Sequence, residues 1–109
     1  MRFTVSVAAL LAALVIATPA SASVRLIGIT SPIRHGGYAT LSVALSPSAN
    51  CSIAVHYKSG DSTAAGLYPK SGSRISWTWK VGTNTTPGRW WITVSCGSAG
   101  TLNTSFVVT

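Results

Sequence analysis

Few side chains in this sequence could take part in acid–base or metal chemistry. Asp61 is the one acidic residue, and His35 and His56 are the two histidines. Acid–base catalysis usually needs a positioned carboxylate or a histidine pair, and the many serines leave a Ser-His-Asp arrangement formally open. No nucleophile-elbow motif accompanies it, however, and the CxxC or HxxxH spacing typical of metal sites does not occur. The composition therefore predicts a non-enzymatic protein that binds no cofactor and no metal.

Cys51 and Cys96 are the only cysteines, and their chemistry depends on the compartment. An even cysteine count in an exported chain predicts a disulfide, and two separate buried thiols are the alternative. A bridge between them would close a long loop, to which chain-entropy arguments assign roughly 4 kcal/mol of stability. The sequence leaves open whether the bridge joins two sheets or lies within one.

The N-terminal residues predict export. Arg2 is followed by a nearly continuous apolar run over residues 5–16, and an Ala-Ser-Ala cleavage box stands at 20–22. This is the pattern of a signal peptide, whereas a membrane-spanning helix needs about 20 apolar residues, more than this run supplies. We therefore expect a signal peptide over 1–22 and a secreted or cell-surface location. The rest, 23–109, is expected to form one domain without a transmembrane segment.

The sequence that follows alternates between apolar and polar residues with a period of two, which is the pattern of half-buried β-strands. Turn residues interrupt the alternation. At Thr86-Pro87-Gly88, proline presets φ at the first corner and glycine accepts a positive φ at the second. The pattern predicts an all-β fold of six strands and leaves room for a short seventh near Leu67. The six are expected at residues 24–30, 38–45, 51–58, 74–81, 89–96 and 102–108.

On each predicted strand one set of alternate residues is apolar, and this set should face the core. Both tryptophans of the 74–81 strand belong to it, because polar residues occupy the positions between them. The core is predicted to contain Leu41, Val43, Ile53, Val55, Trp77, Trp79, Trp90 and Val94.

Several short motifs follow one another from Cys51 onwards. They are CSIAVHYKSG from Cys51, GLYPK from Gly66, SWTWKVG from Ser76, TPGRW from Thr86 and VSC ending at Cys96. As a set they resemble small immunoglobulin-like domains in exported proteins of Gram-positive-type bacteria, over residues 37–109. The resemblance implies an immunoglobulin-like antiparallel β-sandwich of about six to seven strands, with structural cysteines and tryptophans, no catalytic residues and no defined ligand. Trp91 departs from the pattern, in which a proline is expected.

Outward-facing residues of two predicted strands suggest a binding surface. Trp91 should project outward because Trp90 belongs to the core set, and Arg89 shares the outward face. Arg74 and Lys80 occupy the polar face of the preceding strand, so all four would form one basic patch if the two strands lie in one sheet. Tryptophan and arginine are enriched at binding hot spots. In the alternative, a loop or the first strand covers Trp91.

The formal net charge is +7, and every basic residue except Arg2 lies beyond the predicted signal peptide. A basic exported domain is attracted to anionic surfaces. The basic residues are scattered over four of the six predicted strands and the segments between strands, which argues against nucleic acid as a partner. We therefore expect a non-enzymatic extracellular interaction or adhesion module that binds an anionic wall polymer, a polysaccharide or a protein. The alternatives are a structural spacer without a ligand, or a secreted inhibitor or effector acting on a foreign enzyme or membrane.

Overall fold

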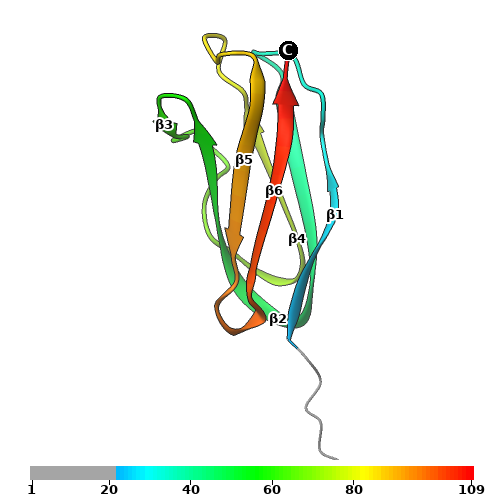
Figure 1. Cartoon of the computed structure of the whole chain (residues 1–109). Helices are drawn as coiled ribbons and strands as arrows, with labels where there is room; N and C mark the ends of the chain where they lie inside the picture. The colour runs from blue at the N-terminus through cyan, green and yellow to red at the C-terminus, as the bar shows by residue number, and fades with distance from the viewer. Residues whose placement is uncertain (1–21) are drawn as a thin grey trace, which may run out of the picture.

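One long strand, β2 (Tyr38–Tyr57), organises the structure, a computed structural model that describes residues 22–109 (Figure 1). The first half of β2 lies between two antiparallel neighbours. These are β1 (Ser23–Ile29) on one side and β4 (Lys70–Lys80) on the other. In this half of β2, the short polar residues face outward and lie opposite outward-facing residues of both neighbours. The apolar residues point to the other side of the sheet, towards the core.

The neighbours of β2 change after Cys51, which is the last residue of β2 that pairs with β4. The second half of β2 pairs with the two-residue β3 (Gly60–Asp61) and with β5 (Gly88–Ser95), and β6 (Thr101–Val108) completes the order beside β5. A short 3-10 turn, η2 (Gly97–Ala99), connects β5 to β6. All these ladders are antiparallel, so the described residues form a curled six-stranded sheet and the all-β prediction is confirmed. In Figure 1, β4 lies behind β5 and β6.

The predicted signal peptide lies outside the described residues, apart from Ala22. Within residues 22–109, the structure contains no helix of the length and apolar character that crossing a membrane requires. The stretch predicted as one domain, 23–109, contributes all six strands.

The continuity of β2 differs from the sequence prediction, which placed separate strands at 38–45 and 51–58. The backbone stays extended through the intervening residues, and the register against β4 shifts between Ala44 and Ala49. An irregularity of this kind bends a strand without ending it. The turn-forming residues therefore redirect β2 from one half of the sheet to the other.

The segment between β3 and β4 is irregular, so the short strand considered near Leu67 does not form. Two contacts nevertheless hold this segment against β4. The indole Nε1 of Trp77 donates a hydrogen bond to the carbonyl oxygen of Tyr68, at 2.8 Å. Gly66 lies so close to Thr78 that a Cβ would collide with the Thr78 carbonyl oxygen, and its φ of +97° also favours glycine.

The core lies between the two halves of the curled sheet. Trp79 of β4 packs edge-to-face against Phe106 of β6, with ring centroids 5.8 Å apart, so the two halves face each other. Ile53 and Trp90 are only partly buried and pack against the edge of this core. The other predicted core residues are buried: Leu41, Val43, Val55, Trp77, Trp79 and Val94.

Cys51 and Cys96 form the predicted disulfide. Ser52 pairs with Ser95 in the ladder between β2 and β5. Cys51 comes directly before Ser52, and Cys96 comes directly after Ser95, so in antiparallel strands the two cysteines lie opposite each other. The bridge therefore occupies the next cross-strand position and ties β2 to the end of β5, at the point where β2 passes from β4 to β5. Both cysteines are buried, which places the bridge at the end of the core.

The segment that connects β1 to β2 crosses from the β1 edge of the curled sheet to its β6 edge. Ile33 follows the end of β1 and lies beside β6, where it forms a parallel bridge to Val108. The Ile33 N–H donates to the Val107 carbonyl oxygen, and the Thr109 N–H donates to the Ile33 carbonyl oxygen, both at 2.9 Å. These bonds extend the pairing of β6 along its edge.

Candidate functional site

Trp91 projects from the outward face of β5 and is 56% exposed. Its cross-strand neighbours are His56 on β2 and Ser105 on β6, so the ring stands in the middle of paired strands. The exposure rules out the alternative in which a loop or the first strand covers it. We call the outward surface of β5, β6 and the second half of β2 the Trp91 face. Its residues are His56, Arg89, Trp91, Thr93, Asn103 and Ser105.

The indole of Trp91 also differs from the other three in its hydrogen bonding. Trp77, Trp79 and Trp90 each donate Nε1–H to an oxygen of the protein. Within residues 22–109, the Trp91 indole has no such acceptor. Trp91 therefore presents both an apolar ring face and a free N–H donor to solvent.

Arg89 lies two residues before Trp91 on the same face. Its Nη1 donates to Ser105 Oγ at 2.8 Å, and Ser105 is the cross-strand partner of Trp91. The hydrogen bond holds the guanidinium at Ser105, the residue opposite Trp91. A guanidinium has five N–H donors, so most of them stay available for an anionic group beside the ring.

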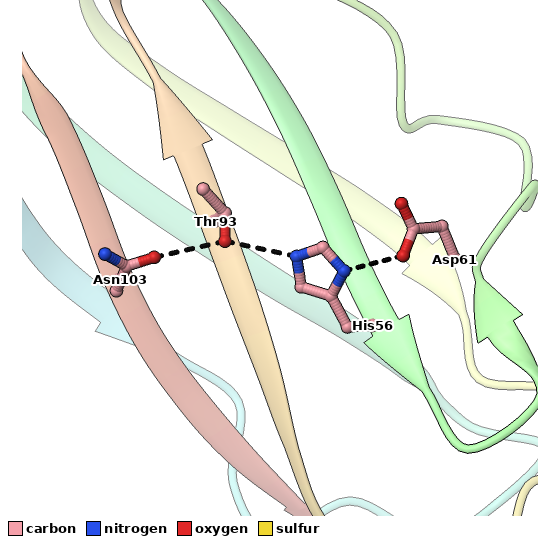
Figure 2. Close-up of polar contacts among 4 residues, drawn as sticks. All are labelled: His56, Asp61, Thr93 and Asn103. Carbon is pink, nitrogen blue, oxygen red and sulfur yellow. Dashed lines mark hydrogen bonds and ion pairs between the residues drawn. The ribbon is translucent and has the colours of Figure 1, made fainter.

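A chain of polar contacts crosses the Trp91 face (Figure 2). His56 Nδ1 lies 2.6 Å from Asp61 Oδ1, and His56 Nε2 lies 3.1 Å from Thr93 Oγ1. Thr93 in turn donates to Asn103 Oδ1 at 3.1 Å. The side chains of His56, Asp61, Thr93 and Asn103 come from β2, β3, β5 and β6 respectively. The chain of contacts holds the His56 ring at both nitrogens and occupies the protein's one acidic side chain.

The order Asp61, His56, Thr93 resembles the carboxylate, imidazole and hydroxyl of an acyl-transfer triad. Sequence reasoning left such an arrangement open but gave no reason to place these residues together. Two features argue against that chemistry. Thr93 directs its proton to Asn103 rather than to His56. The neighbouring backbone N–H groups lie in the plane of the sheet, within the ladders, rather than pointing at a developing oxyanion.

His35 does not join this arrangement. Its Nδ1 lies 3.0 Å from the carbonyl oxygen of Thr109, near the end of β6. Among residues 22–109, no three His, Cys, Asp or Glu side chains are grouped so that they could hold a metal ion.

The predicted four-residue basic patch requires a correction. Arg74 and Lys80 lie on β4, which pairs with the first half of β2, whereas Arg89 and Trp91 lie on β5, which pairs with the second half. The two strands belong to one curled sheet but are not neighbours in it, so the four residues do not form one patch. Arg74 and Lys80 instead belong to a separate outward surface, where Arg74 and Arg25 flank Ala44 from opposite sides.

A hollow of about 630 Å³ opens where β2 ends and where the chain passes from β4 to β5. Tyr57 contributes a phenol whose oxygen accepts a hydrogen bond from Trp79 Nε1 at 3.2 Å. Burial raises the pKa of Tyr57 above its ordinary value, and the hydrogen bond from Trp79 opposes that shift in part. The lining consists of Tyr57, Lys58, Ser59, Gly82, Thr83, Asn84, Thr85 and Thr86.

Sequence reasoning missed this hollow because its lining residues stand in two turns that are distant in sequence. The TPG turn was recognised, but its approach to the end of β2 depends on tertiary structure. In comparisons with known proteins, no family model matches the chain and no curated protein shows significant similarity to it.

Proposed function

We propose that this chain is an exported, non-enzymatic immunoglobulin-like module that binds an acidic polysaccharide through the Trp91 face. The strand order supports the immunoglobulin-like assignment. β1, the first half of β2 and β4 correspond to one sheet of such a sandwich, and the second half of β2, β5 and β6 correspond to the other. The disulfide differs from the immunoglobulin bridge between facing sheets, because it joins neighbouring strands beside the Ser52–Ser95 pair.

The single observation that carries the binding proposal is the exposed, unpartnered ring of Trp91 beside a positioned guanidinium. Trp91 is 56% exposed on paired strands, and Arg89 is held at Ser105, the residue opposite Trp91. A tryptophan in the middle of a rigid sheet buries a large area at little cost in conformational entropy when it packs against a ligand. A sugar ring provides a matching apolar face. Arginine provides the paired donors that a carboxylate or sulfate group accepts.

The overall charge favours an acidic polymer over a neutral one. The chain has eight Lys and Arg residues and a single acid. That acid, Asp61, already contacts His56. The lysine and arginine side chains therefore have no other carboxylate side chain with which to pair, and the field around the domain is positive.

Retention on immobilised acidic polysaccharide tests this function. The oxidised protein is passed over hyaluronan and over neutral dextran at increasing salt concentration. Binding to hyaluronan that persists at about 0.5 M salt, where exposed charges are strongly screened, supports the proposal. Equal retention on both polymers, or release at modest salt, contradicts the proposal and supports the structural-spacer alternative.

A further inference from the structure

The hollow beside Tyr57 has the size and the position of a subsite at one end of the Trp91 face. Its volume of about 630 Å³ lies within the range of small-molecule sites, roughly 300–1,000 Å³. Its lining comes from the end of β2 and from the connection that leads into β5. The same two strands carry His56 and Trp91, so the hollow lies beyond the end of that surface.

The charge of the lining selects an anion. Lys58 is the one charged residue among those that line the hollow, and no acidic side chain accompanies it. Lys58 is exposed, so its ammonium group is accessible to a carboxylate of a ligand in the hollow. A ligand that fits the hollow should therefore carry a single negative group near Lys58.

The remaining lining groups suit a ligand rich in hydroxyls. Ser59, Thr83, Thr85 and Thr86 supply hydroxyls, and Asn84 supplies an amide. Each hydroxyl can donate one hydrogen bond and accept two, and the amide can do both as well. Sugars present the same mixture of donors and acceptors on adjacent carbons.

Tyr57 adds a phenolic hydroxyl to the lining of the hollow. Its oxygen accepts from Trp79, so the phenolic hydrogen remains free to point into the hollow. Its ring packs edge-to-face against Trp90, with ring centroids 6.3 Å apart, and against Phe106, with ring centroids 6.2 Å apart. These contacts fix the position of the hydroxyl before a ligand arrives.

The rim is also held in place by the protein's own hydrogen bonds. The Thr85 N–H donates to the Gly82 carbonyl oxygen at 3.1 Å. Trp90 Nε1 donates to the Thr86 carbonyl oxygen at 2.8 Å. A preformed site loses less entropy on binding than one assembled by the ligand.

We propose that this hollow binds one uronic acid residue, with its carboxylate at Lys58 and a ring or hydroxyl oxygen at the Tyr57 hydroxyl. The inference rests on the proposed function for the class of polymer, and it names the residue that the domain recognises. Free sugar acids and the ends of acidic polysaccharides share this chemistry.

Nuclear magnetic resonance titration of the oxidised protein with glucuronate, and with glucose as the neutral match, tests the site. The amide signals of residues 57–59 and 82–86 and the indole signal of Trp79 should shift. A dissociation constant on the order of millimolar is expected for a ligand of this size. Glucose should bind at least about tenfold more weakly, because it lacks the charge-assisted contact.

Two lysine variants make the comparison specific. Lys58→Gln should weaken glucuronate binding about tenfold. Lys80→Gln, which removes the same charge from β4 outside the lining, should leave it unchanged. Equal losses in both variants, equal binding of glucose, or shifts outside the hollow would overturn the proposal.

Trp91→Ala separates this inference from the proposed function. It should leave glucuronate binding intact while weakening retention on hyaluronan. A hyaluronan tetrasaccharide with glucuronate at its non-reducing end distinguishes the two ligand sources. The same shifts with the tetrasaccharide identify a polymer end, shifts with glucuronate alone identify a free sugar acid, and either result supports the site. Absence of shifts in the hollow with both probes contradicts it, whatever the result for Trp91.

Discussion

His56 and Trp91 are cross-strand partners on β2 and β5, yet their side chains are held very differently. The imidazole is hydrogen-bonded at both nitrogens, to Asp61 and to Thr93. The indole of its partner is 56% exposed. A fixed polar group thus adjoins a free aromatic surface, an arrangement that favours ligand binding at Trp91 over chemistry at His56.

Arg89 should contribute to polysaccharide binding in a way that a generic surface charge does not. Arg89→Gln removes the guanidinium beside Trp91 and should weaken hyaluronan binding about tenfold at physiological salt. Arg74→Gln removes an equal charge from β4 and should have a much smaller effect. Calorimetric titration of both variants measures the difference. Matching losses would mean that net charge alone governs binding.

The contact between the His56 and Asp61 side chains should contribute little to stability. Its side chains are 41% and 62% exposed, and solvent screens such pairs. A double-mutant cycle of His56→Ala and Asp61→Ala in urea should yield a coupling free energy of about 1 kcal/mol or less. A coupling of several kcal/mol would show instead that the polar chain across the Trp91 face is a principal support of the fold.

The disulfide should supply a large share of the folding free energy. Cys51 and Cys96 are 45 residues apart in sequence, and closing a loop of that length stabilises a domain by about 4 kcal/mol. Replacing both cysteines by serine should lower the free energy of unfolding in urea by about this amount. A loss below about 1 kcal/mol would be at odds with a constraint of this length.

Tyr57 should make stability decrease with rising pH in the alkaline range. Its pKa in the folded protein lies above its ordinary value of 10.0, because burial disfavours the phenolate. Below about pH 10 the phenol is neutral in both states. Above it, the unfolded chain ionises first, so the folded state loses stability until the folded pKa is passed.

Tyr57→Phe should therefore flatten the alkaline decrease of the melting temperature, measured by scanning calorimetry between about pH 9 and pH 11. Tyr38→Phe is the matched control, because Tyr38 is 65% exposed. An identical alkaline slope in the wild-type protein and Tyr57→Phe would contradict the account.

The strands could be predicted largely from local pattern. Residues on β4 alternate strictly, and the buried positions of Trp77 and Trp79 follow from a two-residue period alone. The disulfide could be predicted from the cysteine count. The exposure of Trp91 followed from the same alternation, since an inward Trp90 requires an outward neighbour.

The arrangement of the strands depends on distant pairings that a local pattern does not contain. Nothing in residues 46–50 distinguishes a loop from a bend, and the continuous β2 separates Arg74 from Arg89. The contact between His56 and Asp61 likewise requires β3, a strand of two residues that reads as a turn. Trp90 was predicted in the core but lies at its edge, where its indole reaches Thr86.

The most direct test of the account is the affinity for hyaluronan at about 0.5 M salt, where screening leaves mainly short-range contacts. Trp91→Ala is compared with Tyr38→Ala, which removes an exposed aromatic side chain from the first half of β2. The account predicts a loss of about thirtyfold for Trp91→Ala, an unchanged affinity for Tyr38→Ala, and similar melting temperatures for both. Unchanged affinity in Trp91→Ala, or equal losses in the two variants, would contradict it.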